Sequence, residues 1–190
     1  TKNLHYLRVF MNFRKTIFLA TVLAFYLLSQ AQAKPPYYML TGRQGHTFTL
    51  LPDGNFLIVG GATGSANAPT GSAEIYVASR TAFQSIASLG TARSSHTATV
   101  LGDGRVLIAG GFDNGTPMGT TFLLDTRNNS WAAGPAMSRS RGGHTATLIN
   151  TGPNAGNALI CGGQTSADYT AAGGITETCE IFNRSTNLFI

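Results

Sequence analysis

Three histidines recur along the sequence at a nearly constant interval and are the clearest candidates for chemistry. His46, His96 and His144 stand 50 and 48 residues apart. An imidazole can bind a metal or carry a proton, but residues at one position of successive repeats do not converge on one point. No H-x-x-H, H-E-x-x-H or Cys/His cluster accompanies them in the sequence. We therefore expect each imidazole to pack between repeats and hydrogen-bond a neighbouring loop, and we predict no metal site, no cofactor and no catalytic residue.

An arginine precedes each histidine by three residues, at Arg43, Arg93 and Arg141. The planar guanidinium group matches a carboxylate through two parallel hydrogen bonds. These three residues are therefore candidates for binding an acidic group of a ligand. The alternative is that each arginine pairs with backbone carbonyls or with an acidic residue of the adjacent repeat. The sequence leaves both interpretations open.

Each histidine lies in a longer stretch that is itself repeated. The stretches are RQGHTFTLLPDGNFLIVGG at 43–61, RSSHTATVLGDGRVLIAGG at 93–111 and RGGHTATLINTGPNAGNALICGG at 141–163. Alternating small polar and apolar residues, as in HTATVL, are typical of a half-buried strand. Asp-Gly closes a hairpin in the first two copies and leads into an apolar run, which indicates a strand buried on both faces. The glycine pair ends that strand, where we expect positive φ or close backbone approach.

A third and a fourth strand complete each repeat. The segments 74–76, 122–124 and 180–182 each begin nine residues before an aromatic residue that opens the fourth strand: Phe83, Trp131 and Phe189. Four antiparallel strands in a repeat of about fifty residues describe one blade of a β-propeller. The sequence therefore predicts an all-β fold with repeats at approximately 43–89, 93–137 and 141–190.

The repeats resemble kelch repeats, especially the bacterial kind related to the central domain of galactose oxidase. The resemblance rests on R-x-x-H-T-x-T, the Asp-Gly turn, the apolar strand ending in Gly-Gly and the W/F-x5-M/L segment. It implies a β-propeller of kelch-type four-stranded antiparallel blades, of which about three are present. Propellers usually close with four to eight blades, so we expect an incomplete ring and a fragment of a longer reading frame. Two such arcs pairing into a six-bladed ring is the alternative.

The resemblance implies more about the fold than about activity, because one fold serves many functions. Some kelch propellers use arginines at a channel mouth to hold acidic peptide groups, which supports the binding role of Arg43, Arg93 and Arg141. The sequence shows no recognisable copy of the Cys-Tyr cross-link and paired histidine ligands of galactose oxidase. We therefore predict a non-catalytic module that binds a protein, peptide or glycan through the loops 61–72, 111–120 and 163–176. The alternative is the N-terminal fragment of a carbohydrate-active enzyme, either a galactose oxidase-like oxidase or a periplasmic sialic acid mutarotase-like isomerase.

The pattern of the N-terminal residues indicates a targeting segment. Residues 11–33 combine a positive start, a short apolar run at 17–28 and the small-x-small pattern Ala-Gln-Ala at 31–33, as in a secretory signal peptide. A retained membrane anchor is the alternative. Residues 1–10 are expected to be translated upstream sequence outside the fold. The module then spans 34–190 and is exported to the periplasm or the extracellular space, with no membrane association after cleavage.

The charge of the module bears on possible partners, and the predicted export bears on the two cysteines. From residue 34 onward nine basic residues face eight acidic ones, so no basic surface for nucleic acid is expected. Cys161 and Cys179 fall on strands that should be antiparallel neighbours in the third repeat. Disulfides persist in oxidising compartments, so we favour a disulfide over two buried thiols.

Overall fold

The computed structural model describes residues 37–168 and 170–190. The predictions of an upstream segment and a signal peptide concern residues outside this part of the chain. Residues Tyr38–Ile190 form one compact unit. All the regular elements described are β-strands, and no helix within the described residues is long and apolar enough to cross a membrane.

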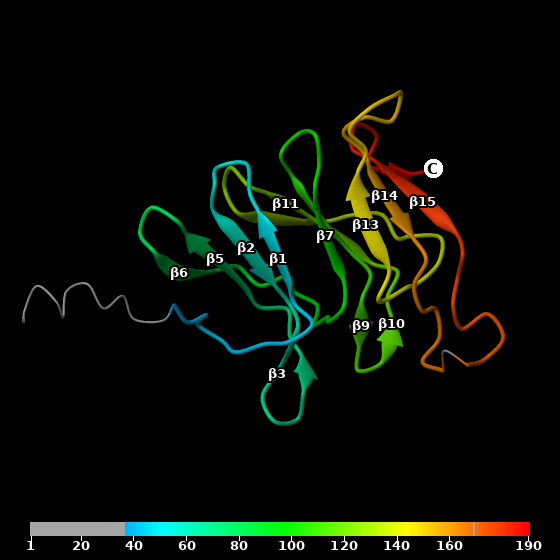
Figure 1. Cartoon of the computed structure of the whole chain (residues 1–190), viewed down its shortest axis with the longest axis horizontal. Coiled ribbons are helices and arrows are strands. Elements are labelled where there is room, and N and C mark those ends of the chain that lie inside the picture. Colours follow the sequence, from blue (N-terminus) through cyan, green and yellow to red (C-terminus); the bar gives the residue numbers. More distant parts are fainter. Residues whose placement is uncertain (1–36, 169) are drawn as a thin grey trace, which may run out of the picture. The chain divides into compact units, whose positions relative to one another are not determined.

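Three four-stranded antiparallel sheets make up this unit, one for each repeat (Figure 1). Blade 1 has the strand order β1-β2-β5-β6, blade 2 is β7-β8-β11-β12, and blade 3 is β13-β14-β15-β16. The strands of blade 1 are β1 (Thr47–Leu50), β2 (Phe56–Val59), β5 (Ala73–Val77) and β6 (Ala82–Ile86). Those of blade 2 are β7 (Thr97–Val100), β8 (Val106–Ala109), β11 (Thr121–Asp125) and β12 (Ser130–Ala133). Those of blade 3 are β13 (Thr145–Leu148), β14 (Ala158–Cys161), β15 (Cys179–Asn183) and β16 (Leu188–Phe189).

The predicted all-β architecture and four-stranded repeat are thus confirmed, and the described residues do not show a closed ring. The first hairpin of each blade forms where the repeated stretch predicts it. Gly54 and Gly104 follow an aspartate in the turn and have φ of 83° and 87°, a conformation that glycine adopts without a steric penalty. In blade 3 the longer turn still closes, because Ile149 N–H donates to the carbonyl of Asn157 at 2.8 Å.

The hydrophobic core lies between the sheets. One cluster of buried side chains joins blade 1 to blade 2 and includes Leu57, Val59 and Ile108. A second joins blade 2 to blade 3 and includes Leu107, Ile160 and Phe182. The first strands β1, β7 and β13 also lie side by side (Figure 1). Each blade therefore depends on its neighbour for burial of its apolar face, as expected of stacked repeats.

The connections between the second and third strands of the blades lie at one end of the sheets. In the first two blades this connection carries a small antiparallel hairpin that the sequence did not predict. The hairpins are β3 (Ala62–Thr63) with β4 (Ala68–Pro69), and β9 (Phe112–Asp113) with β10 (Thr116–Pro117). The third connection is longer and is held by the bridges of Gln164 to Gly142 and Ile175. All three project downward in Figure 1, and we call this the loop end.

Candidate functional site

The repeated residues meet where one blade contacts the next. Each blade joint consists of the glycine pair that ends the second strand of one blade and the Arg-to-His segment that opens the next. At the first joint Gly61 N–H donates to the carbonyl of Arg93 at 2.8 Å, and at the second Gly111 N–H donates to that of Arg141 at 2.9 Å. The glycine pairs have positive φ, as the sequence predicted, and the backbones approach closely there.

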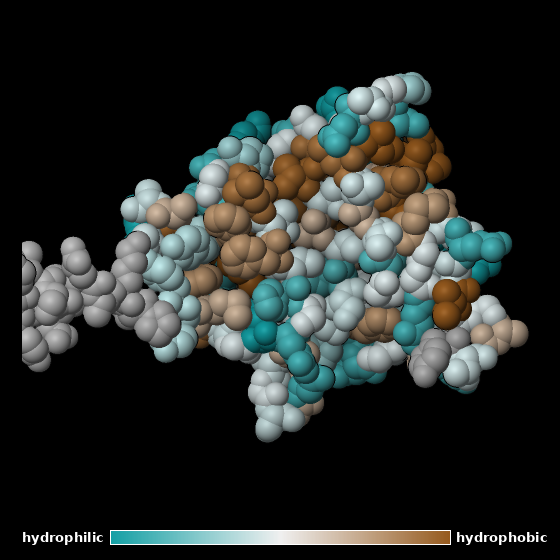
Figure 2. Space-filling view, in the orientation of Figure 1, coloured by the Kyte–Doolittle hydropathy of each residue, from teal (hydrophilic) through white to brown (hydrophobic). Residues whose placement is uncertain are grey.

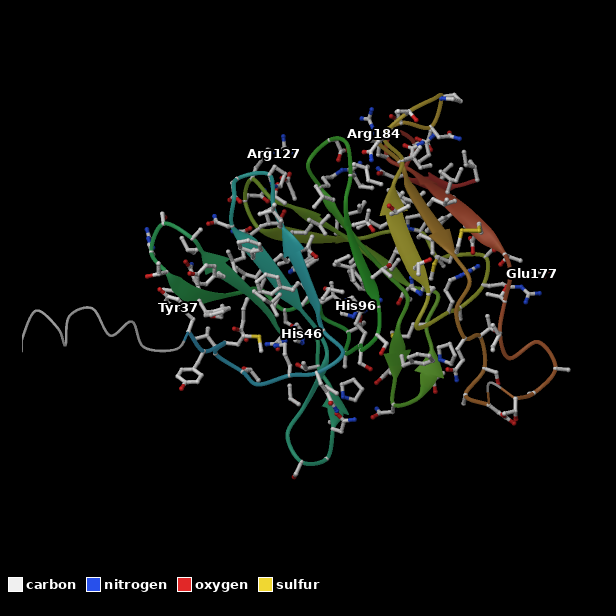
Figure 3. All side chains as sticks on the ribbon, in the orientation of Figure 1. Tyr37, His46, His96, Arg127, Glu177 and Arg184 are labelled. Carbon is white, nitrogen blue, oxygen red and sulfur yellow. A yellow bond between two sulfur atoms is a disulfide. The ribbon has the colours of Figure 1, made fainter. Side chains whose placement is uncertain are left out.

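The histidines pack into these joints, as predicted. His96 Nε2 lies 3.1 Å from Thr47 Oγ1 of the preceding blade, and His144 Nε2 lies 3.0 Å from Thr97 Oγ1. Figure 3 shows His46 and His96 near the starts of β1 and β7. The expectation of a loop partner was wrong, because each threonine is the first residue of a strand. Across the described part of the chain, no three His, Cys, Asp or Glu side chains gather as metal ligands would.

Burial keeps these imidazoles neutral. Loss of hydration, together with the smaller effects of the Arg93 cation and the neighbouring imidazoles, lowers the pKa of His96 to about 3. Burial and the Arg141 cation lower the pKa of His144 to about 4, although a backbone hydrogen bond opposes the change. A neutral imidazole suits the short contact to a threonine hydroxyl, so both residues serve the joints between blades.

The two buried histidines predict a loss of stability in mild acid. In the unfolded chain each takes up a proton below pH about 6.5, whereas in the folded chain it stays neutral until pH about 4 or 3. The free energy of unfolding should therefore fall by about 2 kcal/mol for each histidine between pH 7 and pH 5. Urea unfolding at both pH values measures this loss, and His96→Gln should remove about half of it. An unchanged pH dependence in that variant would contradict the assignment.

The pH range of the stability loss distinguishes an effect of the histidines from an effect of the carboxylates. The pKa of Asp125 is lowered to about 2 by hydrogen bonds from Arg127, and that of Asp103 is lowered by hydrogen bonds from Arg105 although burial opposes them. Carboxylates with a lowered pKa stabilise the fold above their unfolded pKa near 4 and lose that effect only as the pH falls below it. They therefore contribute little to the change between pH 7 and pH 5.

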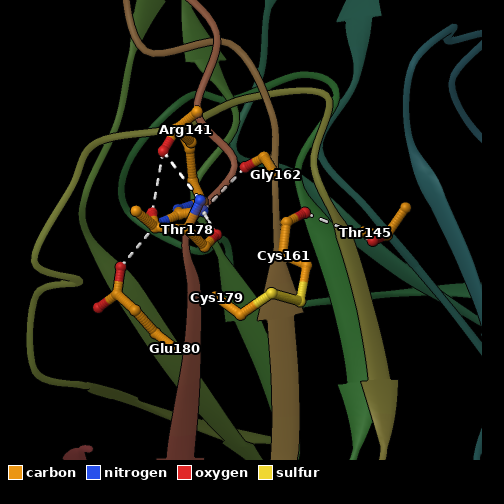
Figure 4. Close-up of a disulfide and its surroundings, with 8 residues drawn as sticks. Arg141, Thr145, Cys161, Gly162, Thr178, Cys179 and Glu180 are labelled. Atoms are coloured by element: carbon orange, nitrogen blue, oxygen red, sulfur yellow. Dashed lines mark hydrogen bonds and ion pairs between the residues drawn. A yellow bond between two sulfur atoms is a disulfide. The ribbon is translucent and has the colours of Figure 1, made fainter.

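The three predicted binding arginines are buried and bonded inside the protein. Arg141 Nη1 donates to the carbonyls of Gly162 and Thr178, both at 2.8 Å, while Nη2 donates to Thr178 Oγ1 at 2.9 Å and Glu180 Oε1 at 2.8 Å (Figure 4). The Arg141 side chain is 0% exposed and that of Glu180 8%. This arginine therefore joins the ends of the second and third strands of its own blade.

Arg43 and Arg93 make corresponding contacts with one difference. Arg43 Nη1 bonds the carbonyls of Gly60 and Ser72, and its Nη2 lies 2.6 Å from Glu74. Arg93 bonds the equivalent backbone carbonyls and two threonine hydroxyls. At the position of the glutamate, Arg93 meets the ring of Phe122, with the guanidinium carbon 5.1 Å from the ring centroid. Burial lowers the pKa of Arg93 to about 10, opposed by the charge of Asp113.

These contacts correct one part of the sequence interpretation. The acidic partners of Arg43 and Arg141 lie in the same blade, not in the adjacent one. A ligand carboxylate at any of the three arginines would have to replace internal acceptors. The binding role of Arg43, Arg93 and Arg141 stays a prediction, while their contacts favour the structural alternative.

The two cysteines form a disulfide across blade 3. Cys161 in β14 and Cys179 in β15 are directly paired in the register, with Cα atoms 4.1 Å apart (Figure 4). The bond closes the connection 162–178 at its base. Because that connection is the longest at the loop end, its closure limits the conformations available to the unfolded chain.

Removing the cross-link should destabilise the fold without changing its shape. Blade 1 has Val59 and Ala73 at the equivalent paired positions, so the double variant Cys161→Val, Cys179→Ala reproduces a pair that the fold already accepts. We expect a loss of about 3 kcal/mol in the free energy of unfolding, measured in urea. A thiol reductant should weaken the wild type by a similar amount and leave the double variant unchanged. Equal stabilities of the two oxidised proteins would contradict the prediction.

A pocket at the loop end brings together residues that the sequence did not single out. Arg139, from the connection between blades 2 and 3, lines it with residues 175–178. Ile175 is 65% exposed, and Arg139 and Glu177 are exposed beside it. No repeated spacing marks these positions, because they lie in the segments where the repeats differ. The pocket offers a cation, an anion and an apolar side chain at the same end as the hairpins.

Comparison with known proteins locates one family motif in the chain. Residues 92–138 match the Kelch motif, and these residues include all four strands of blade 2. No curated protein matches the chain. The chain thus carries a Kelch motif at residues 92–138, and its three four-stranded antiparallel sheets are consistent with kelch blades.

Proposed function

We propose that this chain is an exported, non-catalytic kelch-repeat module that binds a protein, peptide or glycan through its loop end. The observation that carries the proposal is the separation of two kinds of residue. The repeated Arg, His and Gly residues are used in the blades and their joints. Apart from the longer first turn of blade 3, the connections that differ most between repeats lie at the loop end: the hairpins β3–β4 and β9–β10 and the connection 162–178.

The loop end has the character of a recognition surface. The tips of its hairpins are exposed and rich in small polar residues, which form adaptable hydrogen bonds. Two of the three connections carry contacts that hold them in place: Gln44 Nε2 donates to Asn67 Oδ1 at 2.5 Å, and Thr165 N–H donates to the carbonyl of Gly174 at 2.9 Å. Loops positioned by a rigid scaffold are common sites of binding. The disulfide supports export, since such bonds persist in oxidising compartments.

Binding to immobilised peptide and glycan panels tests this proposal. One variant carries arginine at three exposed loop-end positions, Ser65, Thr116 and Ala171, and a matched control carries arginine at three exposed turns of the opposite end, Ser79, Asn128 and Ser185. We expect the loop-end variant to bind the panel ligand at least about 10-fold more weakly and the control to bind like the wild type. A loss confined to the control would contradict the placement. Turnover of a bound sugar would contradict a non-catalytic role.

A further inference from the structure

Four asparagines in the described part of the chain lie in turns with a positive φ. Asn67, Asn114, Asn129 and Asn187 have φ of 51°, 46°, 56° and 54°. The side-chain carbonyl carbon of an asparagine can be attacked by the backbone nitrogen of the following residue, which closes a succinimide ring. The reaction requires that this nitrogen can turn toward the side chain. The structure around the following residue therefore decides which of the four asparagines can react.

In three of these turns the following residue is the first residue of a strand. Ala68 begins β4, Ser130 begins β12 and Leu188 begins β16, and all three are paired with a residue of the neighbouring strand. The Ser130 N–H also donates to Asn128 Oδ1 at 3.0 Å. A strand residue cannot rotate its nitrogen toward the preceding side chain without giving up this pairing. The fold therefore opposes the reaction at these three turns.

Asn114 is the exception, because Gly115 follows it in the turn between β9 and β10 and belongs to neither strand. The Gly115 N–H has no acceptor among the described residues, and nothing lies within 4 Å of a Cβ atom placed on Gly115. Both residues are exposed, and Figure 2 shows the projecting tips of the loop end as mostly pale or hydrophilic. Glycine also gives the backbone its greatest rotational freedom. The attacking nitrogen, the side-chain carbonyl and water are thus accessible to one another at the tip of this hairpin.

We propose that Asn114 is a site of spontaneous modification, at which the side chain loses ammonia and becomes aspartate or isoaspartate. The Gly115 nitrogen gives its proton to hydroxide and attacks Cγ of Asn114, which forms the N–Cγ bond. The Cγ–Nδ2 bond breaks, and Nδ2 takes a proton from water and leaves as ammonia, so that a succinimide remains. Water then adds to either ring carbonyl and breaks the bond from that carbonyl to the nitrogen. Cleavage at Cγ gives aspartate, and cleavage at the backbone carbonyl carbon gives isoaspartate.

The modification changes the charge of the loop end. Asn114 Nδ2 donates to Asp113 Oδ1 at 3.0 Å, so aspartate at this position replaces a hydrogen-bond donor with a second carboxylate. Like charges on adjacent residues repel each other, and isoaspartate also inserts an additional backbone atom into the tip of the hairpin. An effect on ligand binding rests on the proposed function of the loop end. The modification itself does not, so the two proposals can be tested and can fail separately.

Peptide mapping of the full chain tests the modification. The protein is incubated at physiological temperature, at neutral pH and in mild alkali. Mass spectrometry follows each asparagine with time, and an isoaspartyl methyltransferase labels isoaspartate. We expect Asn114 to convert at least about 10-fold faster than Asn67, Asn129 or Asn187, and faster in alkali because the attacking nitrogen must lose a proton. Gly115→Ala should slow the conversion at least about 10-fold, since the added methyl group hinders the nitrogen.

Ala68→Gly provides the matched control in the other loop-end hairpin. It creates the same Asn-Gly dipeptide there, but its second residue remains paired with Thr63, and Asn67 Oδ1 keeps its hydrogen-bond donor. Asn67 in this variant should therefore still convert several-fold more slowly than Asn114, and equal rates would overturn the role of the fold. Asn114 that converts no faster than the other asparagines would overturn the proposal. Conversion to aspartate alone, not slowed by Gly115→Ala, would also overturn it, because direct hydrolysis by water gives that result.

Discussion

Replacement of Arg141 by methionine is expected to lower the free energy of unfolding by about 3–5 kcal/mol. The substitution leaves the carboxylate of Glu180, only 8% exposed, without its cation in a site shielded from water. It also removes the donors that satisfy the carbonyls of Gly162 and Thr178 at the ends of two neighbouring strands. Leaving the buried Glu180 carboxylate without its cation and the Gly162 carbonyl without this donor costs far more than the lost side-chain packing.

A surface arginine provides the matched control for Arg141. Arg127 also pairs with a carboxylate, Asp125 Oδ2 at 2.6 Å, but its side chain is 85% exposed. Water solvates both partners when such a pair is broken, so Arg127→Met should not measurably change the urea midpoint. A loss below about 1 kcal/mol for Arg141→Met, or equal effects of both substitutions, would contradict a structural role for the buried arginine.

Blade 2 shows that the arginine can be held without an acid. Arg93 keeps the two backbone acceptors and also bonds the hydroxyls of Thr91 and Thr120, while Phe122 stands at the position that Glu74 and Glu180 occupy in the other blades. The shared element in all three blades is thus the pair of carbonyls at the strand ends. We infer that the arginine is repeated because it donates hydrogen bonds to these carbonyls. The ion pair with a glutamate is an additional contact in blades 1 and 3.

The fold was predictable from sequence because the repeat constrains it three times. Each copy combines a period-two strand, a turn and a glycine pair at fixed intervals, so an error in one copy would conflict with the others. The hairpins β3–β4 and β9–β10 were missed for the opposite reason. Their strands have two residues each, too few for a period, and they lie where the repeats differ.

The candidate site was less predictable because burial depends on neighbours in space. The sequence pattern of an arginine before a strand is the same whether its side chain contacts a ligand or the strand ends of its own blade. The structure settles the contacts of Arg141 by placing Glu180 and Thr178 beside it, residues that are distant in sequence. Similarly, the threonine partner of each histidine lies one repeat earlier, and only the packing of the blades brings the two together.

The second large effect is expected from the glycine pair, through Gly111→Ala. Gly111 has φ of 97°, and a Cβ atom there would stand 2.6 Å from the carbonyl oxygen of Ser94 and 2.8 Å from the Cβ of His96. Both atoms belong to the segment that opens blade 2 and cannot move without shifting β7. The strained φ and the contact together should lower the free energy of unfolding by about 3 kcal/mol or more.

Comparison with Gly115→Ala separates the cost of the strained φ from the cost of the close contact. Gly115 also has a positive φ, 83°, but nothing lies within 4 Å of a Cβ placed there. That substitution should therefore cost only the conformational penalty, about 1 kcal/mol, in the same urea experiment. If the two variants lose equal stability, the glycine pair serves only the backbone conformation. A larger loss for Gly111→Ala would mean that this glycine recurs because the end of the second strand and the Arg-to-His segment of the same blade approach too closely there for any side chain.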